Sequence, residues 1–120
     1  MPSLAYHNGH WRPVDEVSIG LDDYGFLMGV SVVERLRTFN GAPYRLAEHI
    51  ARLRRSLEIV GWDSDRLAAE TESAIRAFPK RNAALMQPGD DWAIVAFVTP
   101  GATPDEFSAA DEALLVSTSI

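Results

Sequence analysis

The sequence contains no cysteine and only one lysine, Lys80. Without cysteine, neither a disulfide framework nor a thiolate metal site is possible. The histidines His7, His10 and His49 lack the paired spacing of a zinc-binding helix, so no metal site is predicted. Any chemistry that requires a lysine amine must therefore use Lys80 or be missing from this chain.

Long apolar runs and a basic charge balance are also lacking. No stretch approaches the length of a membrane span, and the first residues do not start a signal peptide, so we expect a cytoplasmic protein without membrane contact. The formal net charge of −6 argues against nucleic-acid binding, because a phosphate backbone needs clustered Lys and Arg. The 120 residues, 47% of them hydrophobic, are sufficient for one domain with one core.

Turn signals and apolar runs divide the chain into short strands. Asn8-Gly9 and Asn40-Gly41 are pairs typical of two-residue hairpin turns, and Pro13 is typical of an edge strand. Strands are predicted at 4–8, 10–14, 30–39, 43–45, 93–98 and 113–116. A loop or a single helical turn is predicted at 20–29, and an exposed loop at 100–110, because glycine, proline and small polar residues gather there.

Two helices are predicted between the fourth and fifth strands. The first spans 46–60, because apolar residues recur there at helical spacing and Gly61 can end it. The second is capped by Asp63 or Ser64, and Pro79 disturbs its end. Because strands and helices are segregated, the sequence predicts an α+β fold with a mostly antiparallel sheet and two helices on one side.

Arg52 lies beside the apolar stripe of the first helix. At about 100° per residue it is roughly 120° from the stripe centre, whereas Arg55 points to the outer face. A guanidinium in this position offers a rigid fork of donors for a phosphate. The alternative is a solvated arginine that pairs with Glu48 one turn earlier.

The strand at 30–39 has a carboxylate, Glu34, between apolar residues on one face. A carboxylate buried alone is costly, so Glu34 needs a cation. Arg37 and Arg35 are close in sequence, although both lie on the opposite face of the strand. The sequence therefore predicts a structural ion pair that involves Glu34 and Arg37, with a solvated edge as the alternative.

The stretch from Asp22 to Leu53 resembles the class IV (fold type IV) pyridoxal-phosphate aminotransferases. This family includes branched-chain and D-amino-acid aminotransferases and 4-amino-4-deoxychorismate lyase. The resemblance rests on a loop punctuated by Gly25 and Gly29, the strand that ends at Asn40-Gly41, and the pattern E-H-x-x-R-L at 48–53. It implies the small N-terminal domain of a D-amino-acid aminotransferase-like fold over 1–120.

The resemblance also implies a cofactor, substrates and a site. The cofactor is pyridoxal 5′-phosphate, whose phosphate Arg52 contacts, and the partners are an amino acid, a 2-oxo acid and a second copy in a homodimer. Where many relatives carry an aromatic ring, this chain has Val33, which leaves more room beside the cofactor. The implied substrate pocket is lined by Val33, Met28 and Trp92. Trp92 can equally be a core or interface residue.

No catalytic residue is assigned within this chain. In the resembled family the Schiff-base lysine belongs to the C-terminal domain, and Lys80 is expected to be solvated at a helix end. We therefore expect that domain to be absent from 1–120 and the 120-residue chain alone to be inactive. Two alternatives stay open: an aminodeoxychorismate-lyase-like enzyme, and a standalone non-catalytic α+β interaction module, which a native stop codon after Ile120 would support.

Overall fold

The computed structural model describes residues 2–101 and 112–119 of the chain. Six strands form one antiparallel sheet in the order β2-β1-β6-β5-β3-β4. The strands are β1 (Leu4–His7), β2 (His10–Pro13), β3 (Val32–Phe39), β4 (Ala42–Pro43), β5 (Trp92–Thr99) and β6 (Glu112–Ser119). The helices are α1 (Tyr24–Leu27), α2 (Leu46–Val60) and α3 (Ser64–Arg81), with single 3-10 turns η1 (Val14–Glu16) and η2 (Ala83–Leu85).

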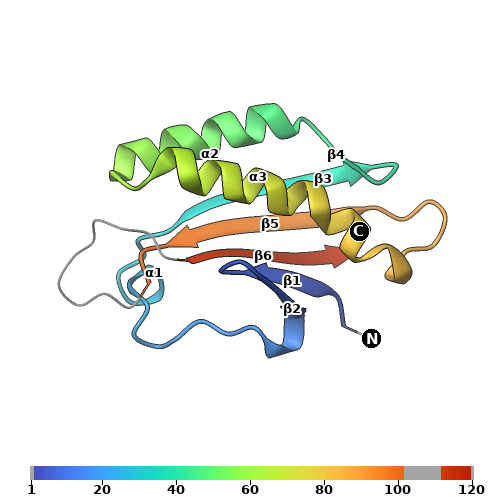
Figure 1. Cartoon of the computed structure of the whole chain (residues 1–120), viewed down its shortest axis with the longest axis horizontal. Helices are drawn as coiled ribbons and strands as arrows, with labels where there is room; N and C mark the ends of the chain where they lie inside the picture. Colours follow the sequence, from blue (N-terminus) through green and yellow to red (C-terminus); the bar gives the residue numbers. More distant parts are fainter. Residues whose placement is uncertain (1, 102–111, 120) are drawn as a thin grey trace.

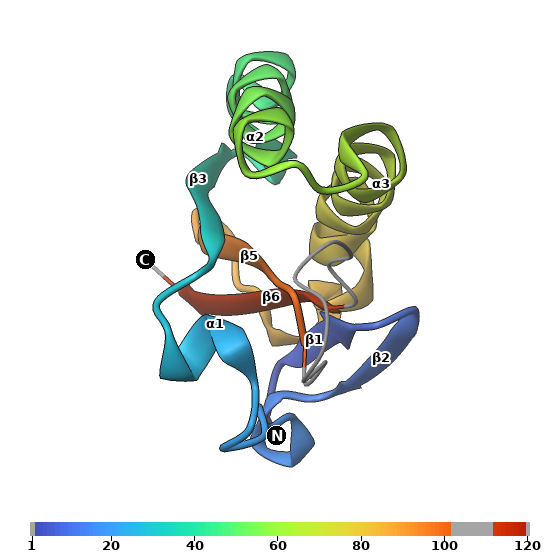
Figure 2. The same ribbon diagram turned by 90° about the vertical axis from the view of Figure 1, so that its left-hand side faces the viewer.

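The two long helices, α2 and α3, cover one face of the sheet, and α1 lies on the other side (Figures 1 and 2). This arrangement confirms the predicted α+β fold. The core forms between the helices and the sheet, because each helix turns one apolar stripe inward. Its fully buried members include Leu53, Leu57, Leu67, Ile75, Phe78, Ile94 and Val98.

Both predicted hairpin turns are present. Asn8 and Gly9 have φ of 48° and 88°, and Asn40 and Gly41 have φ of 52° and 80°. Positive φ at both central residues matches the right-handed twist of the flanking strands, and Asn-Gly tolerates it. The turn at Asn40-Gly41 returns the chain toward α2, so this hairpin positions the start of that helix over β3.

The ends of several elements differ from the sequence prediction by one residue or more. β3 begins at Val32 rather than at residue 30, and β4 contains only two residues. Pro79 lies inside the last turn of α3, which continues to Arg81. The buried Asn82 explains the extension, because its backbone N–H and its side-chain amide both donate to the Phe78 carbonyl. The side chain of Asn82 also bonds both backbone groups of Leu4, which ties the helix end to β1.

Some sequence predictions fall partly outside the described residues. The predicted loop at 100–110 lies outside the described residues apart from its first two positions. The predicted strand at 113–116 lies within β6. In the described ranges no helix has both the length and the apolarity to cross a membrane. Within those ranges no cluster of carboxylate and imidazole groups could hold a metal ion.

Candidate functional site

Glu34 is a carboxylate buried beneath α2. The alternation of β3 turns Val32, Glu34 and Leu36 toward the helices, and Glu34 is 3% exposed. A buried carboxylate is tolerated only where charged or polar partners satisfy it. The helix above supplies those partners.

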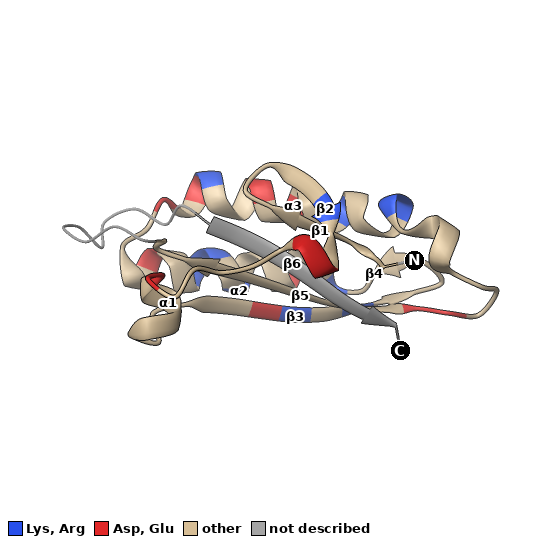
Figure 3. Ribbon diagram, turned by 90° about the horizontal axis from the view of Figure 1, so that it is seen from below, with Lys and Arg blue, Asp and Glu red and all other residues tan. Residues whose placement is uncertain are grey.

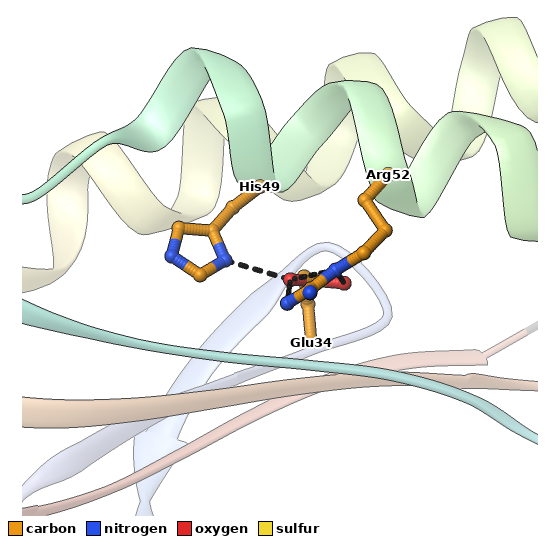
Figure 4. A network of polar contacts seen from close by, with 3 residues as sticks. All are labelled: Glu34, His49 and Arg52. Atoms are coloured by element: carbon orange, nitrogen blue, oxygen red, sulfur yellow. Dashed lines mark hydrogen bonds and ion pairs between the residues drawn. The ribbon is translucent and has the colours of Figure 1, made fainter.

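His49 and Arg52 lie three residues apart on α2 and both reach down to Glu34 (Figure 4). The His49 Nδ1 atom lies 2.7 Å from Glu34 Oε1. The Arg52 Nε atom donates to both carboxylate oxygens at 3.1 Å, and Nη2 donates to Oε1 at 2.5 Å. Residues at this spacing share one helix face, so a single strand carboxylate can bind both.

Arg52 and His49 determine the charge state of this carboxylate. Burial opposes the ionisation of Glu34, but hydrogen bonds from Arg52 and His49 outweigh it and hold the pKa of Glu34 below its usual range. The hydrogen bond to Glu34 in turn raises the pKa of Arg52. Glu34 is therefore an anion at neutral pH that fixes the orientation of a guanidinium.

Arg52 lines a groove beside α2. The side chain of Arg52 is 67% exposed despite its bond to Glu34. The groove has a volume of about 200 Å³ and is lined by Arg45, Glu48, His49 and Arg52. Glu48 pairs with Arg45 at 3.2 Å, and the alternative of an Arg52–Glu48 pair is wrong.

The groove has the chemistry of a phosphate site. Glu34 engages Nε and Nη2 of Arg52, and Nη1 makes no hydrogen bond within the described residues. A guanidinium already fixed by a buried carboxylate can bind an anion without first being ordered. The groove also follows the first turns of α2, the end of a helix whose dipole favours negative charge. The residues present therefore fit a phosphate group.

The predicted ion pair between Glu34 and Arg37 is wrong. The two side chains leave β3 on opposite faces, and α2 provides Arg52 and His49 as nearer partners for Glu34. The Arg37 Nη2 atom instead lies 3.6 Å from the Asp91 carboxylate. Its guanidinium carbon lies 3.9 Å from the centre of the Phe39 ring. Arg37 thus contacts Asp91 and Phe39, near the hairpin end of β3, and not Glu34.

Of the three predicted pocket residues, two are exposed and one is buried. Val33 is 55% exposed and Met28 is 64% exposed, so both can border a pocket. Trp92 is 4% exposed and packs edge-on against Phe78, with ring centres 5.3 Å apart. The structure thus places Trp92 in the core, the alternative that its large apolar ring allowed.

Asp23 is a buried polar residue that the sequence did not single out. Its Oδ1 atom accepts a hydrogen bond from the Gly25 backbone at 2.6 Å, and its Oδ2 atom accepts one from the Thr99 hydroxyl at 2.8 Å. A Cβ on Gly25 would lie 2.5 Å from Thr99 Cγ2. The loop before β3 is therefore fixed to the end of β5, and Gly25 is required by close packing.

Comparison with known proteins identifies the family. The chain belongs to the amino-transferase class IV family, whose model matches residues 31–119 and so includes Glu34, His49 and Arg52. A D-alanine aminotransferase from Bacillus licheniformis is 35% identical over 69 residues, which cover 58% of this chain and 24% of that protein. An aminodeoxychorismate lyase from Bacillus subtilis (strain 168) is 36% identical over 55 residues, 46% of this chain and 19% of that protein.

Solved structures share the fold. The branched-chain amino acid aminotransferase from Escherichia coli aligns with a TM-score of 0.81 and 16% identity over 98% of this chain and 41% of that chain. The T.th. branched-chain amino acid aminotransferase with pyridoxamine 5′-phosphate aligns with a TM-score of 0.79 and 22% identity over 98% and 40%. The chain thus spans less than half the length of these relatives.

Proposed function

We propose that this chain is the N-terminal part of a pyridoxal-phosphate-dependent aminotransferase that transfers an amino group between an amino acid and a 2-oxo acid. The observation that carries the proposal is Arg52, a solvent-facing guanidinium fixed by the buried Glu34 at a groove. When bound, the cofactor would supply an electron sink for the transfer. The role of Arg52 is to bind and orient its phosphate.

The chain's own residues support binding rather than proton transfer. Lys80, the single lysine, is exposed in the last turn of α3 and does not line the Arg52 groove. A lysine that forms a Schiff base needs a desolvated site that lowers its pKa. We therefore propose that this lysine comes from another domain and that the 120-residue chain is inactive alone.

A phosphate-binding assay on the 120-residue chain tests the role of Arg52. Pyridoxine 5′-phosphate is a suitable probe because it has the ring and the phosphate but no aldehyde to react with amines. The titration is followed by the NMR signals of the backbone amides and arginine side chains. The probe should shift the signals of residues in the first turns of α2. The variant Arg52→Gln should weaken binding by about tenfold or more, the equivalent of one charge-assisted hydrogen bond.

Two controls make this result specific. Arg55→Gln removes the same charge from an exposed position of the same helix, and it should bind the probe like the wild type. Pyridoxine, which lacks the phosphate, should not shift these signals. Equal affinities of wild type and Arg52→Gln for the phosphate ester would overturn the proposed role.

A lyase is the second candidate, and the 36% identity to an aminodeoxychorismate lyase supports it. The family match favours either enzyme over a standalone interaction module. Release of pyruvate from 4-amino-4-deoxychorismate, compared with amino transfer to a 2-oxo acid, distinguishes the two reactions in a protein that contains the lysine-bearing domain. We also propose a homodimer, supported by the exposed apolar side chains of Phe26, Leu27 and Met28 around α1.

A further inference from the structure

Arg35 is an exposed arginine without a partner in the described part of the chain. It leaves β3 on the face opposite α2, between Val33 and Arg37. No hydrogen bond, ion pair or ring contact joins its side chain to another described residue. Its neighbour Arg37, by contrast, contacts both Asp91 and Phe39. Arg35 therefore keeps its full set of donors for a ligand.

Arg35 lines a groove of about 440 Å³, larger than the one at Arg52. Its other lining residues are Leu36, Arg37, Tyr44, His49 and Ala93. The lining contains arginine and histidine but no carboxylate, in a chain whose net charge is −6. Arg37 is paired with Asp91 and His49 is bonded to Glu34, so Arg35 is the cation of this lining that is left unpaired among the described residues and can attract an anion. His49 lines both grooves, so the two sites are adjacent.

On the side of Val33, the neighbours of Arg35 on the sheet are apolar. Val95 is its partner in the β3–β5 register, and Phe97 is the partner of Val33. Val33 is 55% exposed, and Phe97 is half-buried and lines a separate apolar cavity of about 190 Å³. β5 contains no charged residue, whereas β3 does (Figure 3). The sheet thus presents a guanidinium beside a hydrocarbon surface.

We propose that Arg35 binds the carboxylate of the amino acid and 2-oxo acid substrates, with an apolar substrate side chain over Val33 and Phe97. Val33 and Arg35 are two positions apart on one strand face, about 7 Å, which matches the length of a branched-chain acid. The planar fork of arginine pairs with both oxygens of a carboxylate. The proposal rests on the proposed function for the class of ligand. It assigns the carboxylate and the cofactor phosphate to different arginines.

The experiment titrates the 120-residue chain with 4-methyl-2-oxopentanoate and follows backbone amide signals by NMR. Signals of Leu36 and Ala93, which line the groove, should shift. Arg35→Gln should weaken binding by about tenfold, the equivalent of one charge-assisted hydrogen bond, without unfolding the chain because the residue is exposed. Arg55→Gln is the matched control and should bind like the wild type.

A second probe separates the carboxylate from the side chain. The primary amide of the same acid keeps the apolar group and loses the charge, and it should bind more weakly than the acid. The inference is overturned if Arg35→Gln binds the acid like the wild type, if the amide binds as tightly as the acid, or if the acid causes no shift. One result separates the two proposals. If Arg52→Gln binds pyridoxine 5′-phosphate as tightly as the wild type does, but Arg35→Gln no longer binds the acid, the proposed function fails and the Arg35 site is supported.

Discussion

Glu34→Gln is the substitution that tests the site most directly, because one buried carboxylate binds both Arg52 and His49. In the wild type, Glu34 accepts three hydrogen bonds from Arg52 and contacts His49. The glutamine amide keeps the shape of the side chain but removes its charge. Hydrogen bonds to a charged group contribute about 1.5–3 kcal/mol in proteins, and the 67% exposure of Arg52 favours the lower part of that range. We therefore expect a loss of about 2 kcal/mol in the free energy of unfolding at pH 7.

The stability difference between the wild type and Glu34→Gln should depend on pH. The pKa of Glu34 is lower in the folded chain than the ordinary value of 4.5. Its stabilisation is therefore complete above about pH 4.5 and is lost as the pH falls through the folded pKa, because the unfolded chain takes up the proton first. Glutamine does not titrate, so the difference between wild type and Glu34→Gln should shrink below pH 4.5.

Urea unfolding of both proteins at pH 7 and at several lower pH values measures the difference. Glu48→Gln is the matched control, because Glu48 is 65% exposed and pairs only with an exposed arginine. It should change the stability by less than about 0.5 kcal/mol. Equal stabilities of wild type and Glu34→Gln at pH 7, or a difference that persists unchanged at acid pH, would refute the reasoning.

Three further predictions concern contacts outside the Glu34 site. Gly25→Ala should lower the stability by about 1–3 kcal/mol in urea unfolding, because the new methyl group meets Thr99; Gly20→Ala meets only the end of an exposed side chain and should be nearly neutral. Thr99→Val should destabilise by about 1–3 kcal/mol, since it removes a bond to the buried loop carboxylate, and faster hydrogen exchange in the loop would support this. Burial and the Glu70 hydrogen bond raise the pKa of Tyr6 to about 12, so Glu70→Gln should lower it in an ultraviolet titration; an unchanged curve contradicts this.

Local sequence signals are sufficient for most of the fold. The turns at Asn8-Gly9 and Asn40-Gly41, the helix end at Gly61 and the helix cap at Asp63 all depend on residues that are neighbours in the chain. Their conformations follow from short-range physics, and the structure confirms them. The angle of Arg52 on α2, beside the apolar stripe, also follows from helical periodicity, whereas the groove that it lines does not.

The sequence predictions are wrong where contacts between residues far apart in the chain determine the structure. The sequence prediction pairs Glu34 with a cation on its own strand, but its partners come from a helix 15 and 18 residues away. The extension of α3 past Pro79 depends on Asn82, which also bonds β1, 78 residues away. Period and propensity contain no information about such partners. The sequence contains two signals for the site: a carboxylate between apolar residues of a strand, and the pattern E-H-x-x-R-L on a helix. Only the fold shows that these two segments contact each other.

The two proposed arginine sites differ in how strongly each guanidinium is fixed. Arg52 is held by three hydrogen bonds to a buried carboxylate, so little conformational entropy remains to be lost when it binds an anion. Arg35 has no partner among the described residues and must be ordered by its ligand. A fixed guanidinium suits a cofactor that stays bound through many reaction cycles. An unpaired one suits an amino acid and a 2-oxo acid that exchange in every cycle, because the ordering cost weakens binding and permits release.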